Sequence, residues 1–238
     1  MAWQTAAVFG ASGGIGGALV EQLCADGCDV RAGSRSGKVP EGAIATTFRF
    51  DLEDEASIAA AVAGWAGDPP DLVIVASGVL TLPDGTGPER SLKAIDPAAM
   101  EAIFRLNTLG PALIAKHVLP LLPRDRPSTF AAISARVGSI GDNRMGGWHS
   151  YRASKAALNM LIRNFAIEMG RTHKHARIVG LHPGTVDTPL SAPFQSGLPE
   201  GQLSGPQEAA RNLLGVLSKL EPKDSGKVFD WRGDIVPE

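Results

Sequence analysis

The chain has 238 residues, of which 44% are hydrophobic and 20% are charged, and its formal net charge is -2. These values are ordinary for one globular domain that buries a sizeable core. The small negative charge argues against general electrostatic attraction to nucleic acid or to an anionic membrane surface, so neither partner is expected. No apolar run approaches the length of a membrane span, and no secretory signal pattern is seen.

The two cysteines, Cys24 and Cys28, are too few for a disulfide framework. No second cysteine pair or close group of histidines completes a metal site with them. The sequence therefore predicts no metal, and its cysteine use favours a cytoplasmic location.

Short apolar runs alternate with helix-like segments from one end of the chain to the other. A strand over 5–9 is followed by a helix over 14–24, strands over 28–32 and 45–50, a helix over 56–65 and a buried strand over 72–76. A helix over 97–117 has Pro97 in its first turn and Pro120 beyond its end. The remaining elements are a strand over 129–133, a helix over 151–169, a strand over 177–181, a helix over 206–220 and a strand over 227–230.

This alternation is typical of an α/β protein whose parallel sheet is covered by helices on both faces. With right-handed crossovers, it predicts a single-domain, Rossmann-type doubly wound sheet of about seven strands over 1–238. Two long loops interrupt the pattern. The loop over 139–149 is polar and Gly-rich, and the loop over 185–205 is predicted to be a substrate lid.

The turn after the first strand has the pattern Gly-x-x-x-Gly-x-Gly at Gly10, Gly14 and Gly16. Glycine allows a tight turn, close approach of the backbone to a pyrophosphate and close packing of helix on strand. The N-terminus of the following helix adds N–H donors and a partial positive charge. The turn is therefore predicted to bind a dinucleotide through Gly10, Ser12, Gly13, Gly14 and Ile15.

Further motifs follow in a fixed order, at residues 76–78 (Ala-Ser-Gly), 151–155 (Tyr-Arg-Ala-Ser-Lys) and 183–188 (Pro-Gly-Thr-Val-Asp-Thr). Together with the glycine spacing, they resemble the short-chain dehydrogenase/reductase family over essentially the whole chain. Residues 136–140, 147–148 and the tail around Gly233 are most similar to the C-factor and sniffer-type carbonyl reductase branch. The resemblance implies that the cofactor also contacts Asp51, Leu52, Ala76, Ser77, Gly78, Asn107, Tyr151, Lys155, Pro183, Gly184, Val186 and Thr188.

The end of the second strand bears on the choice between NAD and NADP. In dinucleotide-binding folds an acidic residue there binds the ribose 2′-hydroxyl, whereas an arginine suits a 2′-phosphate. Here Ser34 and Arg35 occupy that place, and no carboxylate does. Because a guanidinium can clamp a phosphate with two hydrogen bonds, NADPH is predicted to be favoured over NADH.

Tyr151, the only tyrosine of the chain, and Lys155 lie four residues apart and are expected on one helix face. A carbonyl reductase needs a group that protonates the developing alkoxide, and a neighbouring ammonium is expected to lower the tyrosine pKa for this task. The resemblance implies that Lys155 also binds the nicotinamide ribose and that Asn107 holds a water that links Lys155 to solvent.

The catalytic serine has two candidate positions in this chain, Ser134 and Ser139. The family commonly has it directly before x-x-Gly after the fifth strand, where this chain has Ala135. Ser134 is predicted to take the role if the strand end is irregular. If the strand stays regular through Ala135, Ser134 points away from the site and Ser139 is the better candidate.

These observations predict an NAD(P)-dependent oxidoreductase that acts on a small or medium carbonyl or alcohol. The displaced serine leaves open a dinucleotide-binding sensor or signalling protein on the same fold. A sugar-nucleotide epimerase is disfavoured, because the region after Gly184 is short for a large substrate domain. The resemblance implies a homodimer or a homotetramer.

Overall fold

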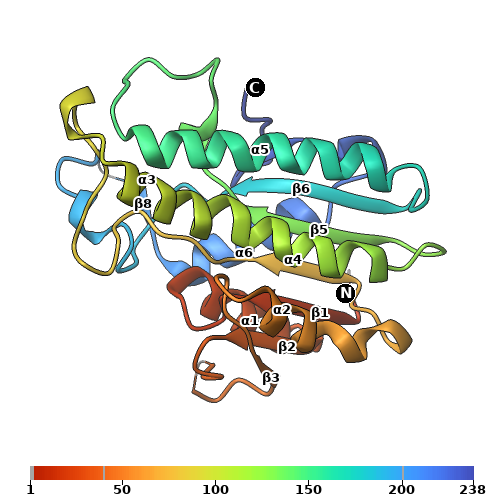
Figure 1. The fold of residues 1–238 in the computed structure, drawn as a ribbon. Helices are drawn as coiled ribbons and strands as arrows, with labels where there is room; N and C mark the ends of the chain where they lie inside the picture. The colour runs from red at the N-terminus through yellow and green to blue at the C-terminus, as the bar shows by residue number, and fades with distance from the viewer. Residues whose placement is uncertain (1–2, 40, 200) are drawn as a thin grey trace.

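The structure, a computed structural model, describes residues 3–39, 41–199 and 201–238. Within these residues a seven-stranded sheet has the order β3-β2-β1-β4-β5-β6-β9, and every neighbouring pair is parallel (Figure 1). This confirms the predicted doubly wound fold. The strands are Thr5–Phe9 (β1), Asp29–Ser34 (β2), Thr46–Arg49 (β3), Leu72–Val75 (β4), Ser128–Ile133 (β5), Ala176–His182 (β6) and Val228–Asp230 (β9).

Helices cover both faces of the sheet (Figure 1). One apolar cluster joins the first face to α1 and α6, and a second cluster joins the opposite face to α2, α4 and α5. Side chains alternate between the two faces along β1, so this strand contributes to both clusters. Ala6 and Val8 belong to the first, and Ala7 and Phe9 belong to the second. The helices are Gly14–Ala25 (α1), Glu55–Val62 (α2), Pro97–Phe104 (α3), Gly110–Val118 (α4), His149–Met169 (α5) and Pro206–Leu217 (α6).

The predicted helix over 97–117 is interrupted. A π-helical turn at Arg105–Leu109 separates α3 from α4. Such turns are rare and are frequently found at functional sites. The predicted helix over 56–65 is also shorter, because α2 ends at Val62 and continues as a 3-10 turn at Ala63–Gly67.

The two ends of the predicted lid pair with each other as short strands. Thr185–Val186 (β7) and Leu203–Ser204 (β8) form a two-stranded parallel sheet, and a 3-10 turn at Ala192–Phe194 lies between them. Residue 200 of this segment lies outside the described residues. In the part of the chain that the structure describes, no helix is long and apolar enough to span a membrane.

The strand order fixes where the functional segments meet. β1 and β4 are neighbours at the point where the chain changes direction across the sheet. In open α/β sheets, ligands bind at this switch point, outside the carboxyl ends of the strands. The glycine turn after β1 and the Ala-Ser-Gly segment after β4 therefore lie side by side.

Candidate active site

The glycine turn has the shape that a phosphate cradle needs. Gly10 has a φ of +95°, and a Cβ placed on Gly16 would lie 2.1 Å from the Gly10 carbonyl oxygen. A Cβ on Gly14 would lie 2.6 Å from Cγ2 of Thr188. Gly13 precedes α1 and provides no side-chain cap, so the first N–H groups of the helix are free to bind an anion. These features fit the predicted pyrophosphate site.

A cleft of about 320 Å³ follows the carboxyl ends of the strands. Inside it, the Ser77 hydroxyl is buried without a hydrogen-bond partner within the described residues, which suits a cleft that holds a polar ligand. The cleft brings together ten of the residues predicted to bind the cofactor: Ile15, Ala76, Ser77, Gly78, Tyr151, Lys155, Pro183, Gly184, Val186 and Thr188.

Ser34, Arg35, Asp51 and Leu52, which are also predicted to bind the cofactor, do not line this cleft. The Gly33 carbonyl at the end of β2 accepts hydrogen bonds from the N–H groups of Gly10 and Ala11, which places the next residues beside the glycine turn. Of these, Ser34 is buried and donates to the Lys38 carbonyl, and Arg35 is exposed. Further along the chain, an Asp51 carboxylate oxygen accepts the N–H of Glu53, and Leu52 packs under Gly110.

Asn107 lies in the π-helical turn and is completely buried. Its Oδ1 accepts the N–H of Val79, and its Nδ2 donates to the Val79 carbonyl, both at 2.8 Å. Nδ2 also lies 3.3 Å from the hydroxyl of Ser154 on α5. Asn107 therefore holds the segment after β4 against the helix that carries Tyr151 and Lys155. The water predicted to join it to Lys155 stays a prediction.

Lys155 is buried and Tyr151 is half-buried, and both lie on α5. Lys155 Nζ donates to the Ile133 carbonyl at 2.9 Å and lies 5.8 Å from the centre of the Tyr151 ring. Burial lowers the pKa of Lys155 to about 8 and raises the pKa of Tyr151 to about 12. The predicted lowering of the tyrosine pKa was therefore wrong for this arrangement, because loss of hydration disfavours the charged phenolate. Tyr151 is protonated at neutral pH.

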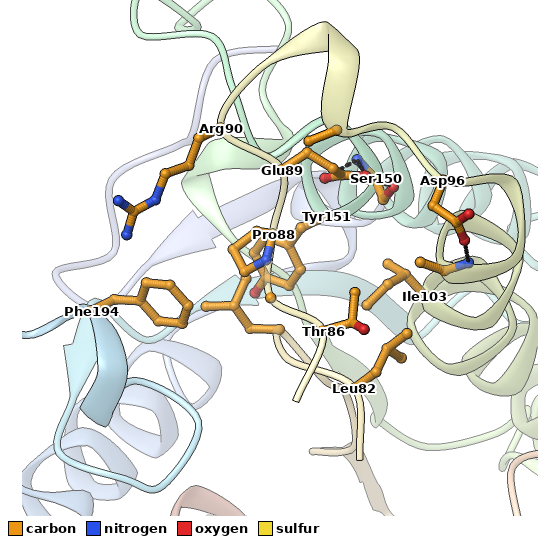
Figure 2. Close-up of a pocket in the computed structure, with 14 residues that line it drawn as sticks. Leu82, Thr86, Pro88, Glu89, Arg90, Asp96, Ile103, Ser150, Tyr151 and Phe194 are labelled. Atoms are coloured by element: carbon orange, nitrogen blue, oxygen red, sulfur yellow. Dashed lines mark hydrogen bonds between the residues drawn. The ribbon is translucent and has the colours of Figure 1, made fainter. Parts of the chain in front are cut away.

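A second cavity, of about 450 Å³, opens on the other side of Tyr151. Figure 2 shows Tyr151 near the middle of the lining residues, with Phe194 to its left and Glu89 and Ser150 above it. Much of the wall is apolar and comes from Leu80, Leu82, Pro88, Ala94, Ala99, Ile103 and Phe194. Phe194 belongs to the predicted lid, so the lid does border this cavity.

Residues 4–198 match the family described as short chain dehydrogenase. The chain belongs to this family. It is 35% identical over 147 residues to the C-signal of Myxococcus xanthus, covering 62% of this chain and 83% of that one. It is 32% identical over 227 residues to the 1-hydroxy-2-glutathionyl-2-methyl-3-butene dehydrogenase of a Rhodococcus species, covering 94% of both chains.

Among solved structures, the NADPH-bound carbonyl reductase from chicken fatty liver has a TM-score of 0.84 with this chain. The two are 28% identical, and the match covers 99% of each chain. The predicted resemblance to C-factor proteins and carbonyl reductases is confirmed, and the protein is an oxidoreductase of the short-chain dehydrogenase type.

The segment that carries the serine in other short-chain dehydrogenases is regular here. The Ser134 N–H donates a hydrogen bond of 2.7 Å to the Leu181 carbonyl, which continues the pairing of β5 with β6. Ala135 has an extended backbone (φ −154°, ψ 146°). The Ser134 hydroxyl donates to Oδ1 of Asn159 at 2.5 Å. The strand is therefore regular, but Ser134 still lines the cleft, and its only hydroxyl proton is engaged by Asn159 of α5.

Ser139 does not replace it in this arrangement. Its hydroxyl accepts the N–H of Asp142 at 3.0 Å and borders a different cavity, next to the C-terminal tail. Among the described residues, no hydrogen bond joins either serine hydroxyl to Tyr151.

Glu89, to which no sequence pattern points, joins the loop before α3 to the start of α5. Its carboxylate accepts the N–H and the hydroxyl of Ser150, and its carbonyl accepts the Trp148 N–H at 2.6 Å (Figure 2). Trp148 has a left-handed backbone (φ 50°) and packs edge-on against Tyr151 and Phe194. A pattern of local spacing cannot reveal these contacts, because they join segments about sixty residues apart.

Proposed function

We propose that the protein is an NADPH-dependent carbonyl reductase for small or medium, largely apolar carbonyl compounds. The observation that carries the proposal is the position of Tyr151. Its side chain borders both the cleft that fits the nicotinamide and the apolar cavity beyond it. A proton donor at this junction stands where a substrate carbonyl would meet the cofactor.

When bound, the nicotinamide supplies a hydride to the carbonyl carbon. The Tyr151 hydroxyl donates its proton to the carbonyl oxygen, and the high pKa of this buried phenol keeps that proton in place at neutral pH. Lys155, whose pKa burial lowers to about 8, can give up a proton to a neighbouring oxygen without a large energetic cost. The apolar wall and the Trp148–Phe194 pair exclude water from the reacting oxygen.

Support for NADPH comes from two sides. Arg35 follows β2 beside the glycine turn, where an arginine suits the 2′-phosphate. The carbonyl reductase from chicken fatty liver, which matches almost the whole chain, binds NADPH.

The second cavity, at about 450 Å³, falls within the range of small-molecule sites, about 300–1,000 Å³. Its apolar wall favours an apolar substrate body.

The test is an NADPH-oxidation assay of the purified protein with a panel of aldehydes and ketones, run beside Tyr151→Phe. We expect turnover with one or more carbonyls, and loss of that turnover in Tyr151→Phe with little change in the dissociation constant of NADPH. The substitution removes only the hydroxyl, and the chain has no other phenol.

Two results would count against the proposal. Near-normal turnover by Tyr151→Phe would remove the mechanism. Tight NADPH binding without turnover of any carbonyl, or of any alcohol with NADP, would favour the sensor alternative. Self-association into a dimer or tetramer stays a prediction, which sedimentation velocity of the same preparation would test.

A further inference from the structure

The proposed reaction needs a neutral hydrogen-bond donor at the oxygen where negative charge develops, besides the proton donor itself. The side chains at the expected place do not provide one. Ala135 has no polar group, the Ser134 hydroxyl donates to Asn159, and Ser139 faces another cavity. The imidazole of His182 also lines the cleft, together with Tyr151 and Lys155.

His182 is the last residue of β6, and the alternation of that strand gives its direction. Ile178 belongs to the apolar cluster on the α5 face of the sheet, and a Cβ on Gly180 would touch Ile162 of α5. His182 follows in the same alternation, so its side chain leaves the sheet on the face that α5 covers. Tyr151 and Lys155 are on α5, and all three residues line the same cleft.

The imidazole of His182 is available for a ligand. Its Nδ1 is buried and has no hydrogen-bond partner in the described part of the chain. A buried polar atom without a partner is costly, and binding sites are one place where such atoms occur, because a ligand completes them. A neutral imidazole always carries one N–H donor, and the tautomer follows the partner that is present.

The imidazole is also neutral under ordinary conditions. Burial, together with the positive charge of Arg136, lowers the pKa of His182 to about 4, and the nearby Asp230 carboxylate opposes this only partly. Arg136 and Asp230 are themselves joined by a salt bridge of 3.0 Å. His182 therefore offers an uncharged N–H rather than an imidazolium, as a serine hydroxyl offers an uncharged O–H.

We propose that His182 donates a hydrogen bond to the carbonyl oxygen of the substrate, in the role left empty by the alanine at position 135. The inference rests on the proposed carbonyl reductase function. In this role His182 keeps its proton throughout. Tyr151 alone transfers a proton to the oxygen, and His182 stabilises the charge that builds up there.

The experiment compares His182→Ala with the double variant His182→Ala/Ala135→Ser, using a carbonyl that the wild-type protein reduces. His182→Ala should lower kcat by about 10²–10³, the typical cost of losing one such donor. Ala135→Ser places a hydroxyl where related enzymes have it. The kcat of the double variant should therefore be at least tenfold higher than that of His182→Ala. The dissociation constant of NADPH should stay within about twofold in both.

A binding measurement gives a second readout. The affinity of the alcohol product for the complex with NADP should fall in His182→Ala and rise again in the double variant. His173→Ala is the matched control. His173 is also buried, with an unpartnered Nε2, but it lies beyond the C-terminal end of α5. Its variant should lower the melting temperature and leave kcat unchanged.

Equal kcat values for the wild-type protein and a folded His182→Ala would overturn the role of His182 and leave the proposed function intact. The role of His182 would also be overturned if adding Ala135→Ser did not raise the kcat of His182→Ala, or if Ser134→Ala lowered kcat more than His182→Ala does. If His182→Ala does not fold, His182→Gln, which keeps an N–H donor, is compared with His182→Leu at similar stability, and equal kcat values overturn the role. A wild-type protein that reduces no carbonyl would overturn both proposals.

Discussion

Lys155 is expected to reduce the stability of the protein, so Lys155→Met should be more stable than the wild type. The ammonium group is almost completely buried, and burial lowers its pKa from 10.5 to about 8. A tenfold change in a proton equilibrium corresponds to about 1.4 kcal/mol, so keeping this charge in the folded state at pH 7 costs about 3 kcal/mol. Methionine fills a similar volume without a charge.

The substitution also removes a hydrogen bond. Lys155 donates to the Ile133 carbonyl, and the loss of that bond costs about 1 kcal/mol. The net gain in the free energy of unfolding at pH 7 is therefore about 2 kcal/mol. Turnover should be lost at the same time, since Lys155 lies beside Tyr151 in the cleft.

The gain should depend on pH with a definite sign. Below pH 8 the folded protein carries the costly proton, whereas between pH 8 and 10.5 the folded state has released it and the unfolded chain still binds it. The wild-type protein thus gains stability over this range relative to the variant. The advantage of Lys155→Met should shrink above pH 8 and vanish between pH 9 and 10.

Urea unfolding of both proteins at pH 7 and at pH 9.5 measures this difference. Lys174→Met is the control, because Lys174 also donates to a backbone carbonyl, that of Gly170, but from an exposed position. Its free energy of unfolding should change by less than about 0.5 kcal/mol at either pH. A less stable Lys155→Met at pH 7, or an advantage that does not change with pH, would refute the reasoning.

The other predictions concern the cofactor and the proton donor. Gly14→Val should abolish NADPH binding, because its side chain would crowd Thr188 at the phosphate turn, whereas Gly215→Val, with open space around it, should bind normally in fluorescence titrations. Arg35→Ala should weaken NADPH at least tenfold and leave NADH unchanged; equal losses for both cofactors would contradict the 2′-phosphate role. Alcohol oxidation should keep rising through pH 10, because burial holds the Tyr151 pKa at about 12; a plateau near pH 7 in initial rates would contradict this.

Features encoded by residues close together in the chain could be predicted from the sequence. The glycine turn, the strands and the shared helix face of Tyr151 and Lys155 all depend on short spacing and on the periods of helix and strand. Their positions in the sheet then follow from the strand order that the structure shows.

Features that depend on packing between distant segments could not be predicted. The π-helical turn places Asn107 against Val79, and the Ser134 hydroxyl donates to Asn159. The tyrosine pKa was predicted from its charged neighbour alone, and the degree of burial that reverses its direction is a property of the folded protein. No sequence pattern points to His182, since its place in the cleft and its unpartnered Nδ1 exist only after folding.

The double attachment of Glu89 has a consequence for local motion. One residue joins the cavity wall to the first turn of α5 through both its carboxylate and its carbonyl. Proteins open in cooperative units, so the loop over 79–90 and the start of α5 should exchange their amide hydrogens together rather than separately. The wall of the cavity then cannot loosen without releasing the tyrosine beneath it, and a partly opened molecule would present neither a pocket nor a proton donor.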